Sequence, residues 1–277
     1  ANLPEELKDS GEIEGLDRAG LERSRAFESE LGGKGWLAPT EPVELGGGGL
    51  TPDHALVIIE ELGKNGLRWL LEQGNPALRR ALQQWGTEEQ QTRYLPGISG
   101  GRAALWYFSM EPGAELDPDS LGIQAFLEGD DYVLDGKGTF LGRGHWPEYL
   151  WTLAVTDPDA PPSQRTAAFL VPADLDGISV HTPETLVPGA THHVTFDKVW
   201  VPTNCLVGDE GGGWSLMQAA LLEEQAVEYP SAYDEDVAGL IKSASETNRY
   251  GVAISKHPFF QQLLMEVYIN SERIRIF

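Results

Sequence analysis

The sequence predicts an α+β protein of three parts. These are an N-terminal helical domain at residues 1–98, a middle antiparallel β-barrel or sandwich domain at 99–207, and the start of a C-terminal helical bundle at 208–277. Three observations predict this order. Apolar residues follow a helical period before residue 98 and again after residue 207, and the part between them consists of short apolar runs separated by Pro, Gly and Asp.

The N-terminal part carries helix start and stop signals. In LTPDHALVIIEELGKNG, Thr51 is placed as an N-cap and Pro52 as the first helical residue, and an apolar stripe follows. A second stripe contains Leu78, Leu82 and Trp85. The segment TEEQ at 87–90 predicts a capping box that opens a short helix, which we expect to stop before Pro96.

The middle part has the pattern of a β-domain. IQAFLEGDDYVLDGK, residues 123–137, is two short runs around a Gly-Asp-Asp turn and predicts a hairpin. Further runs, YLWTLAVTD, TAAFLVPAD, GISVHTP and HHVTFDKVWVP, follow at short spacing. An antiparallel barrel or sandwich accounts for this pattern.

Three helices are expected in the last part. One begins after the glycine run at 211–213, a second covers DEDVAGLIKSASETN, and a third begins near Pro258. The third helix reaches Phe277 in mid-pattern without a C-cap, so we expect an incomplete bundle. A β-domain between two helical parts predicts a ligand cleft where the three meet.

Composition excludes several classes of function. The 277 residues carry a net charge of −23, with 43 acidic against 20 Lys and Arg residues, which argues against binding to nucleic acid or anionic membranes. No apolar run approaches the roughly 20 residues of a membrane span. The polar, acidic first residues do not form a signal peptide. Cys205 is the single cysteine, so a cytoplasmic protein is expected, with Cys205 as a small packed residue.

The motifs, taken in order, resemble the flavin-dependent acyl-CoA dehydrogenases. The markers are LGGGGLTPDHALVIIEELGKNG, GTEEQQTRYLPGISGG, EPGAELD, EGDDYVLDGK, TDPDAPPSQRTAAFLVPADLDGISV, VTFDKVWVPTNCLVGDEGGGW and LLEEQ. The resemblance implies dimers or tetramers that hold FAD in a cleft between the β-domain and the C-terminal helices. It also implies an acyl-CoA substrate, a glutamate base, α,β-dehydrogenation to a trans-2-enoyl-CoA, and an electron-transfer flavoprotein as acceptor.

The first flavin loop of that family corresponds here to SMEPGAELD, residues 109–117. Tyr107 matches the family's aromatic residue before the loop. Met110 stands where a Thr hydroxyl bonds the flavin ring. Ser109 beside it is the candidate substitute for that hydroxyl, although neighbouring residues of a strand point to opposite sides. Glu115 and Leu116 replace the Gly and the pyrophosphate-binding Ser. A carboxylate repels phosphate, and Leu cannot donate a hydrogen bond to it.

The second flavin element corresponds to GTFLGRG, residues 138–144. Phe140 takes the place of a Trp and still offers a flat apolar face to the flavin. Gly142 takes the place of a Thr and offers no hydroxyl. Hydrogen-bonding positions are thus lost in two separate loops, which favours a reduced or absent flavin site. The alternative is that backbone N–H groups hold most of the flavin.

Two further residues are candidates by resemblance. Glu224 occupies the position of a catalytic glutamate on the first C-terminal helix, on one face with Trp214, Met217 and Leu221. A solvated surface carboxylate is the alternative for it, and the family's commoner base lies on a late helix that this sequence does not contain. Arg249 is the candidate for an arginine that reaches a neighbouring subunit's FAD pyrophosphate, with a surface arginine as the alternative.

No metal site is predicted. His192 and His193 are adjacent in a strand pattern, so their side chains face opposite sides of the sheet. The resulting hypothesis is an FAD-dependent acyl-CoA dehydrogenase in a homo- or hetero-oligomer. The alternative is a degenerate, flavin-poor subunit that supports an active partner, and a flavin enzyme acting on a different substrate is a third reading.

Overall fold

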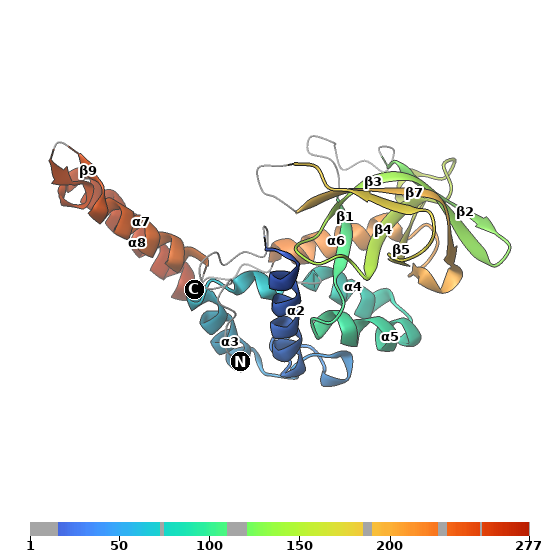
Figure 1. The fold of residues 1–277 in the computed structure, drawn as a ribbon, viewed down its shortest axis with the longest axis horizontal. Coiled ribbons are helices and arrows are strands. Elements are labelled where there is room, and N and C mark those ends of the chain that lie inside the picture. The colour runs from blue at the N-terminus through green and yellow to red at the C-terminus, as the bar shows by residue number, and fades with distance from the viewer. Residues whose placement is uncertain are drawn as a thin grey trace.

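A computed structural model describes residues 16–72, 75–109, 121–184, 190–226, 232–249 and 251–276. Helices come first, a single large sheet follows, and helices close the chain (Figure 1). This order confirms the predicted three-part architecture. Among the described residues, no helix is both long and apolar enough to cross a membrane.

The N-terminal helices pack in two groups. Phe27 and Leu31 of α2 meet Leu62 of α3 in a small apolar cluster, whereas α4 and α5 join the core of the sheet. Both elements of the predicted capping box are present at the start of α5, where the Thr87 hydroxyl accepts from Gln90 N. The bounds are α2 Arg18–Gly33, η1 Val43–Leu45, α3 Pro52–Lys64, η2 Arg68–Glu72, α4 Pro76–Trp85 and α5 Glu88–Ser99.

The expected stop before Pro96 is wrong, because α5 continues through this proline to Ser99. Proline removes one N–H from a helix, and burial of the surrounding turn outweighs that loss. Leu95 and Ile98 on either side of it are buried in the core. The Arg102 guanidinium donates to the Pro96 carbonyl at 2.5 Å, which supports this last turn.

Eight strands form one sheet in the order β6-β7-β3-β1-β4-β5-β8, with β2 pairing to β3 and β4. The predicted hairpin is present as β2 and β3, which are joined at Gly129 and Asp130. The bounds are β1 Leu105–Ser109, β2 Ile123–Glu128, β3 Asp131–Leu141, β4 Tyr149–Val155, η4 Pro162–Gln164, β5 Thr166–Pro172, β6 Ile178–His181, β7 Thr191–Pro202, η5 Thr203–Cys205 and β8 Leu206–Val207.

The sheet is mixed, whereas the sequence predicts an antiparallel one. β4 runs parallel to β1 and β2, and every other pairing of this sheet is antiparallel among the described residues. The cause is topological. The loop after β3 reverses the chain but places β4 on the far side of β1, which itself runs against β3, so β4 shares the direction of β1.

The C-terminal helices fall into two groups. Helix α6 lies beside β5 and α4, and its Trp214, Leu216 and Met217 are buried in the main core. Helices α7 and α8 form a hairpin that extends away from the sheet, with β9 at its far end (Figure 1). The bounds are α6 Gly213–Ala226, α7 Ala232–Glu246, β9 Asn248–Arg249, β10 Val252–Ala253, η6 Ile254–Lys256 and α8 Pro258–Ile276.

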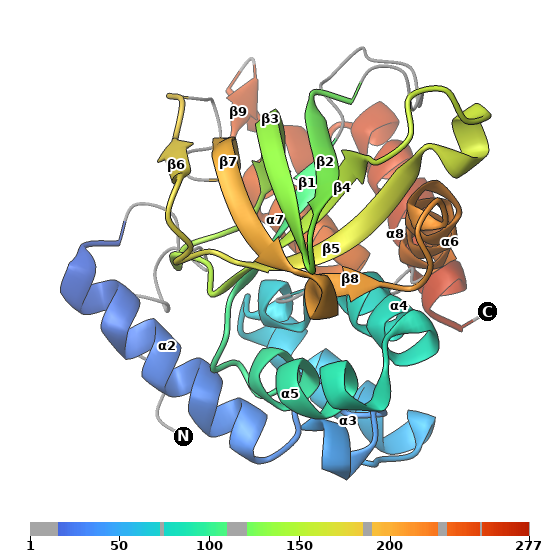
Figure 2. The ribbon, with the colours of Figure 1, turned by 90° about the vertical axis from the view of Figure 1, so that its right-hand side faces the viewer.

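The main core is formed by the sheet together with the helices α4, α5 and α6. Figure 2 shows the sheet above α4 and α5, with α2 alongside them. Large side chains from the strands, such as Trp151, Phe169 and Phe196, are almost fully buried there, together with Tyr94 from α5. This core fixes the strands that carry the candidate site.

Candidate functional site

Strands β1 and β2 lie end to end along β3. Ser109, the last residue of β1, pairs with Thr139, and Ile123, the first residue of β2, pairs with Gly136. The end of β1 and the start of β2 are therefore close together along β3. Residues 110–120 of this segment, including Met110, Glu115 and Leu116, lie outside the described residues.

Two candidate residues, Tyr107 and Ser109, share one face of β1. Both are half-buried, and Tyr107 pairs with Leu141 on β3 and with Trp151 on β4. The alternate residues Trp106 and Phe108 are buried and point to the opposite face, as strand alternation requires. Tyr107 and Ser109 therefore face the side of the sheet opposite to Trp106 and Phe108.

Phe140 lies within the core. Its ring is 0% exposed and meets Phe108 edge to face at 5.9 Å between centroids, with Phe196 at 6.2 Å. Neighbouring side chains thus cover its faces, and a planar ligand can stack on this ring only if the core opens.

Gly142 lies directly against the indole of Trp106. Gly142 directly follows β3, and extending the β1–β3 register by one position beyond the Tyr107–Leu141 pair sets it opposite Trp106. A Cβ atom built on Gly142 overlaps the indole ring. A side chain such as Thr cannot occupy this position while the indole stays in place. The indole nitrogen donates to the carbonyl of His145 at 3.1 Å. This hydrogen bond fixes the orientation of the ring in addition to its packing against Gly142.

His192 stacks on the same indole. The two ring centroids are 3.7 Å apart with an interplanar angle of 8°. Its Nε2 lies 3.2 Å from the carbonyl of Gly142, which can only accept, so Nε2 carries the proton. Its Nδ1 meets the Thr182 hydroxyl at 2.8 Å. His193 is exposed on the opposite face, which confirms the predicted alternation of the two histidines.

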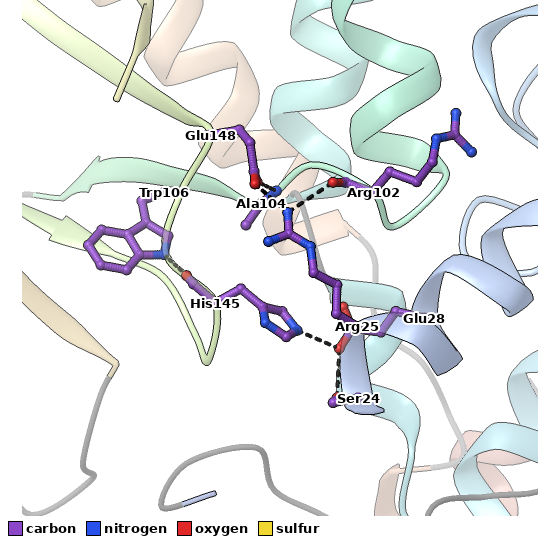
Figure 3. A network of polar contacts seen from close by, with 8 residues as sticks. All are labelled: Ser24, Arg25, Glu28, Arg102, Ala104, Trp106, His145 and Glu148. Atoms are coloured by element: carbon purple, nitrogen blue, oxygen red, sulfur yellow. Dashed lines mark hydrogen bonds and ion pairs between the residues drawn. The ribbon is translucent and has the colours of Figure 1, made fainter. Parts of the chain in front are cut away.

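The loop that follows Gly142 is anchored to helix α2 (Figure 3). Nε2 of His145 lies 3.1 Å from Oε1 of Glu28, and the Ser24 hydroxyl donates to the same oxygen at 2.8 Å. Glu28 and His145 are both buried. Nearby, Arg25 forms an ion pair with Glu148. These contacts fix the His145 carbonyl that receives the indole N–H.

Glu148 holds a second part of the same loop. Its Oε2 accepts from the backbone N–H of Ala104 at 2.6 Å, just before β1 begins. Arg25 also donates to the carbonyl of Arg102 at 2.9 Å. One helix, α2, therefore fixes both the start of β1 and the loop before β4, and Trp106 is bonded to that loop through the His145 carbonyl (Figure 3).

Comparison with known proteins gives a consistent set of relatives. The model of the acyl-CoA dehydrogenase N-terminal domain matches residues 5–102. The acyl-CoA dehydrogenase FadE29 of Mycobacterium tuberculosis is 29% identical over 250 residues, which cover 88% of this chain and 63% of FadE29. This chain thus spans less than two thirds of that relative.

Solved structures agree with the fold at similar identity. The Tcur3481-Tcur3483 steroid ACAD is 28% identical with a TM-score of 0.76, and the match covers 98% of this chain and 68% of that one. The ChsE4-ChsE5 complex from Mycobacterium tuberculosis is 25% identical with a TM-score of 0.73, over 91% and 67% of the respective chains.

The family model over residues 5–102, the curated relatives and the solved structures all support the acyl-CoA dehydrogenase family. Members of this family typically bind FAD. In this chain, however, the residues at the second flavin element do not fit the hydrogen bond that the family pattern places there. The indole of Trp106 fills the space at Gly142 where the family pattern has a Thr hydroxyl for the flavin, and Phe140 is enclosed. A Thr side chain and this indole cannot share the space at Gly142.

The two remaining candidates are Glu224 and Arg249, and neither is seen at Gly142. Glu224 lies on α6, whose residues Trp214 and Met217 are buried as its predicted stripe requires, but the Glu224 side chain lies outside the described residues. Arg249 is exposed on β9 at the tip of the α7–α8 hairpin, far from the sheet (Figure 1). Its role toward a neighbouring subunit stays a prediction.

Burial changes the ionisation of two residues where α5 meets the sheet. Burial raises the pKa of the Cys205 thiol, although its hydrogen bond with Tyr94 acts in the opposite direction. Burial also raises the pKa of Tyr94 to about 12. Cys205 is 2% exposed, which confirms the prediction of a small packed residue.

Sequence reasoning missed Trp106, His192 as its stacking partner, and the Glu28–His145 contact. The role of Trp106 could have been predicted from one pattern in the sequence. Once β1 and β3 are paired, a bulky Trp106 faces a glycine at 142, and such a large-to-small pairing indicates that the large side chain fills the vacant space. The contact from α2 to His145 joins residues 117 positions apart, and no local pattern predicts it.

Proposed function

We propose that this chain is a subunit of an acyl-CoA dehydrogenase complex that holds no flavin in its own β-domain. It supports a second, flavin-bearing subunit of the same family in a hetero-oligomer. The complex as a whole performs the FAD-dependent α,β-dehydrogenation of an acyl-CoA thioester and passes its electrons to an electron-transfer flavoprotein. This chain contributes structure and contact surface.

One observation carries this proposal. The indole of Trp106 occupies the space at Gly142 and is held there by His192 and by the His145 carbonyl. A hydroxyl lost by drift leaves an open site, whereas here a large, oriented side chain fills it. The changes at Met110, Glu115 and Leu116 in the first loop point in the same direction.

Two related structures support a two-chain assembly. The Tcur3481-Tcur3483 steroid ACAD and the ChsE4-ChsE5 complex each combine two different named chains. A similar arrangement here lets one chain lose its flavin contacts while its partner keeps them. A CoA thioester is the substrate class, and a steroid side chain or another acyl group are both compatible with it.

The flavin content of the purified chain tests the proposal. The full chain, expressed alone, is denatured and its released flavin is measured against protein concentration. We expect far less than one FAD per chain. Co-purification with a flavin-bearing family member that keeps Thr at both flavin positions should give one FAD per partner chain and none for this one. A stoichiometric flavin spectrum from this chain alone contradicts the proposal.

Turnover of the assembled complex provides a second test. If this chain supplies no flavin ring, its Glu224 has no hydride acceptor beside it, and Glu224→Gln should leave turnover unchanged. The matched control is Glu223→Gln on the same helix turn. A large loss of turnover in Glu224→Gln but not in Glu223→Gln places a catalytic base in this chain and contradicts the supporting role.

A further inference from the structure

We propose that Trp106 is a resident plug, an aromatic side chain that takes the space of the flavin ring and excludes planar ligands from this β-domain. His192 and His145 act as positioning residues that hold the plug. This inference rests on the proposed function, in which the domain keeps its fold without flavin. It adds the residue that excludes the ring and the class of ligand that its removal admits.

The first argument is the fit of the indole to the sheet. Trp106 is 4% exposed and contacts Gly142, the residue after β3, so closely that no Cβ fits there while the indole stays in place. His192 covers one face of the indole in parallel at 3.7 Å. A flat heteroaromatic ring therefore already lies stacked on an imidazole, as a planar ligand would.

The second argument is that polar contacts fix the plug in orientation. The single N–H of the indole points to the His145 carbonyl, and the Glu28–His145 contact holds that loop against α2 (Figure 3). On the other side, the hydrogen bonds of His192 to Gly142 and Thr182 fix the imidazole. A buried aromatic ring with its N–H satisfied and one face stacked has little freedom to move aside.

The third argument concerns access to the plug. Trp146 is 61% exposed and the centroid of its ring lies 5.8 Å from that of Trp106, so the plug has an exposed aromatic side chain as a neighbour. If the indole is removed, its space becomes a cavity bordered by the rings of Trp146 and His192. Apolar cavities of this kind take up small aromatic molecules.

Riboflavin is the appropriate probe, because it carries the flavin ring without phosphates. The first loop places Glu115 and Leu116 where the family binds the pyrophosphate, so the anionic FAD is a poorer test of the ring slot. We expect Trp106→Ala to bind riboflavin at least about tenfold more tightly than the wild-type chain, and more tightly than it binds FAD, as measured by quenching of flavin fluorescence.

The matched control is Trp200→Ala, which removes an exposed tryptophan from β7 and leaves the plug in place. This variant should bind riboflavin as weakly as the wild type. If folded Trp106→Ala binds no better than Trp200→Ala, the plug proposal is wrong and the proposed function stands. If the wild-type chain itself takes up stoichiometric flavin, both are wrong.

A second variant covers the case in which Trp106→Ala does not fold. Gly142→Ala places a Cβ in the space of the indole and should displace it, which increases acrylamide quenching of tryptophan fluorescence and lowers the melting temperature. Gly33→Ala, where a Cβ meets open space, is the control. Equal quenching and melting temperature in the two variants means that the indole does not lie against Gly142, and overturns the proposal.

Discussion

Glu28 on helix α2 and His145 in the loop before β4 form a buried contact, with 3.1 Å between Glu28 Oε1 and His145 Nε2. The two residues are far apart in the sequence, and both are less than a tenth exposed. Their contact joins the N-terminal helices to the sheet beside Trp106. Its strength therefore affects both the stability of the chain and the position of the indole.

Removing the Glu28 carboxylate should destabilise the chain strongly. Glu28→Ala leaves the buried His145 and the Ser24 hydroxyl without their acceptor, and each buried donor left without a partner costs about 1–3 kcal/mol. Urea unfolding followed by far-UV circular dichroism measures the loss. The near-UV spectrum of the folded fraction should also change, because the His145 carbonyl holds the indole of Trp106.

Glu22→Ala is the matched control on the same helix. Glu22 pairs with Arg18 at 3.2 Å on the exposed side of α2, and such surface pairs contribute at most about 1 kcal/mol. Equal losses of stability in Glu28→Ala and Glu22→Ala would show that the buried contact does not hold the two parts together.

The ion pair between Arg79 and Glu41 should behave as a coupled buried pair. Arg79 Nε lies 2.8 Å from Glu41 Oε1, and both side chains are almost fully buried. Arg79→Leu leaves Glu41 buried with its neutral donors Ser99 and Gln83 but without this cation, at a cost of about 3–5 kcal/mol.

The double variant Arg79→Leu with Glu41→Leu decides whether the two residues are coupled. The double variant leaves neither charge buried alone. Its loss in the free energy of unfolding should therefore be about 0.5–3 kcal/mol smaller than the sum of the losses in the two single variants, as measured by chemical denaturation. Strict additivity of the two losses contradicts the pairing.

Gln90 should contribute more to the stability of the chain than its part in the capping box accounts for. Its Oε1 accepts from Thr87 N at 2.9 Å, and its Nε2 donates to the carbonyls of Asn204 and Leu206, at 2.8 and 2.7 Å. Thr87→Ala removes one half of the cap, at about 1 kcal/mol. Gln90→Ala also breaks the link from α5 to the segment before β8.

We expect Gln90→Ala to exceed Thr87→Ala by at least about 1 kcal/mol in the free energy of unfolding, because it leaves carbonyl groups without their donor. Urea unfolding of the two variants side by side provides the comparison. Equal losses would limit Gln90 to capping.

The stability of the chain should fall at alkaline pH in part because of Tyr94. Burial raises its folded-state pKa to about 12, whereas an unfolded tyrosine ionises near pH 10. The contribution of Tyr94 to the free energy of unfolding is complete below about pH 10, because the tyrosine is then protonated in both the folded and the unfolded chain. Between about pH 10 and 12 only the unfolded chain has released the proton, so this contribution falls by about 1.4 kcal/mol per pH unit.

Tyr94→Phe removes this titration, so its stability should fall less steeply than that of the wild type between pH 10 and 11.5. Chemical denaturation at several pH values gives both slopes. Some slope should persist in the variant, because burial also raises the pKa of Tyr149 and of the Cys205 thiol. Parallel slopes for the two proteins contradict a buried, neutral Tyr94 hydroxyl.

Local signals in the sequence were sufficient for most secondary structure. The Thr87–Gln90 capping box and the turn at Gly129 and Asp130 involve residues close in the chain, so their chemistry can be read directly. The helix through Pro96 could not be predicted this way. Its continuation depends on burial of Leu95 and Ile98 against distant strands, which outweighs the local preference to stop.

The sequence by itself determined the three-part architecture, the family, and the loss of hydrogen-bonding groups at Met110 and Gly142. Those conclusions depend on residue type and order, which are local properties. Only the tertiary structure decided what fills the space at Gly142. The pairing of β1 with β3, the stacking of His192 on Trp106 and the contact from Glu28 to His145 join residues distant in the chain. Such contacts are determined by packing, because the volume left by a small residue is filled by whichever distant side chain the fold brings to it.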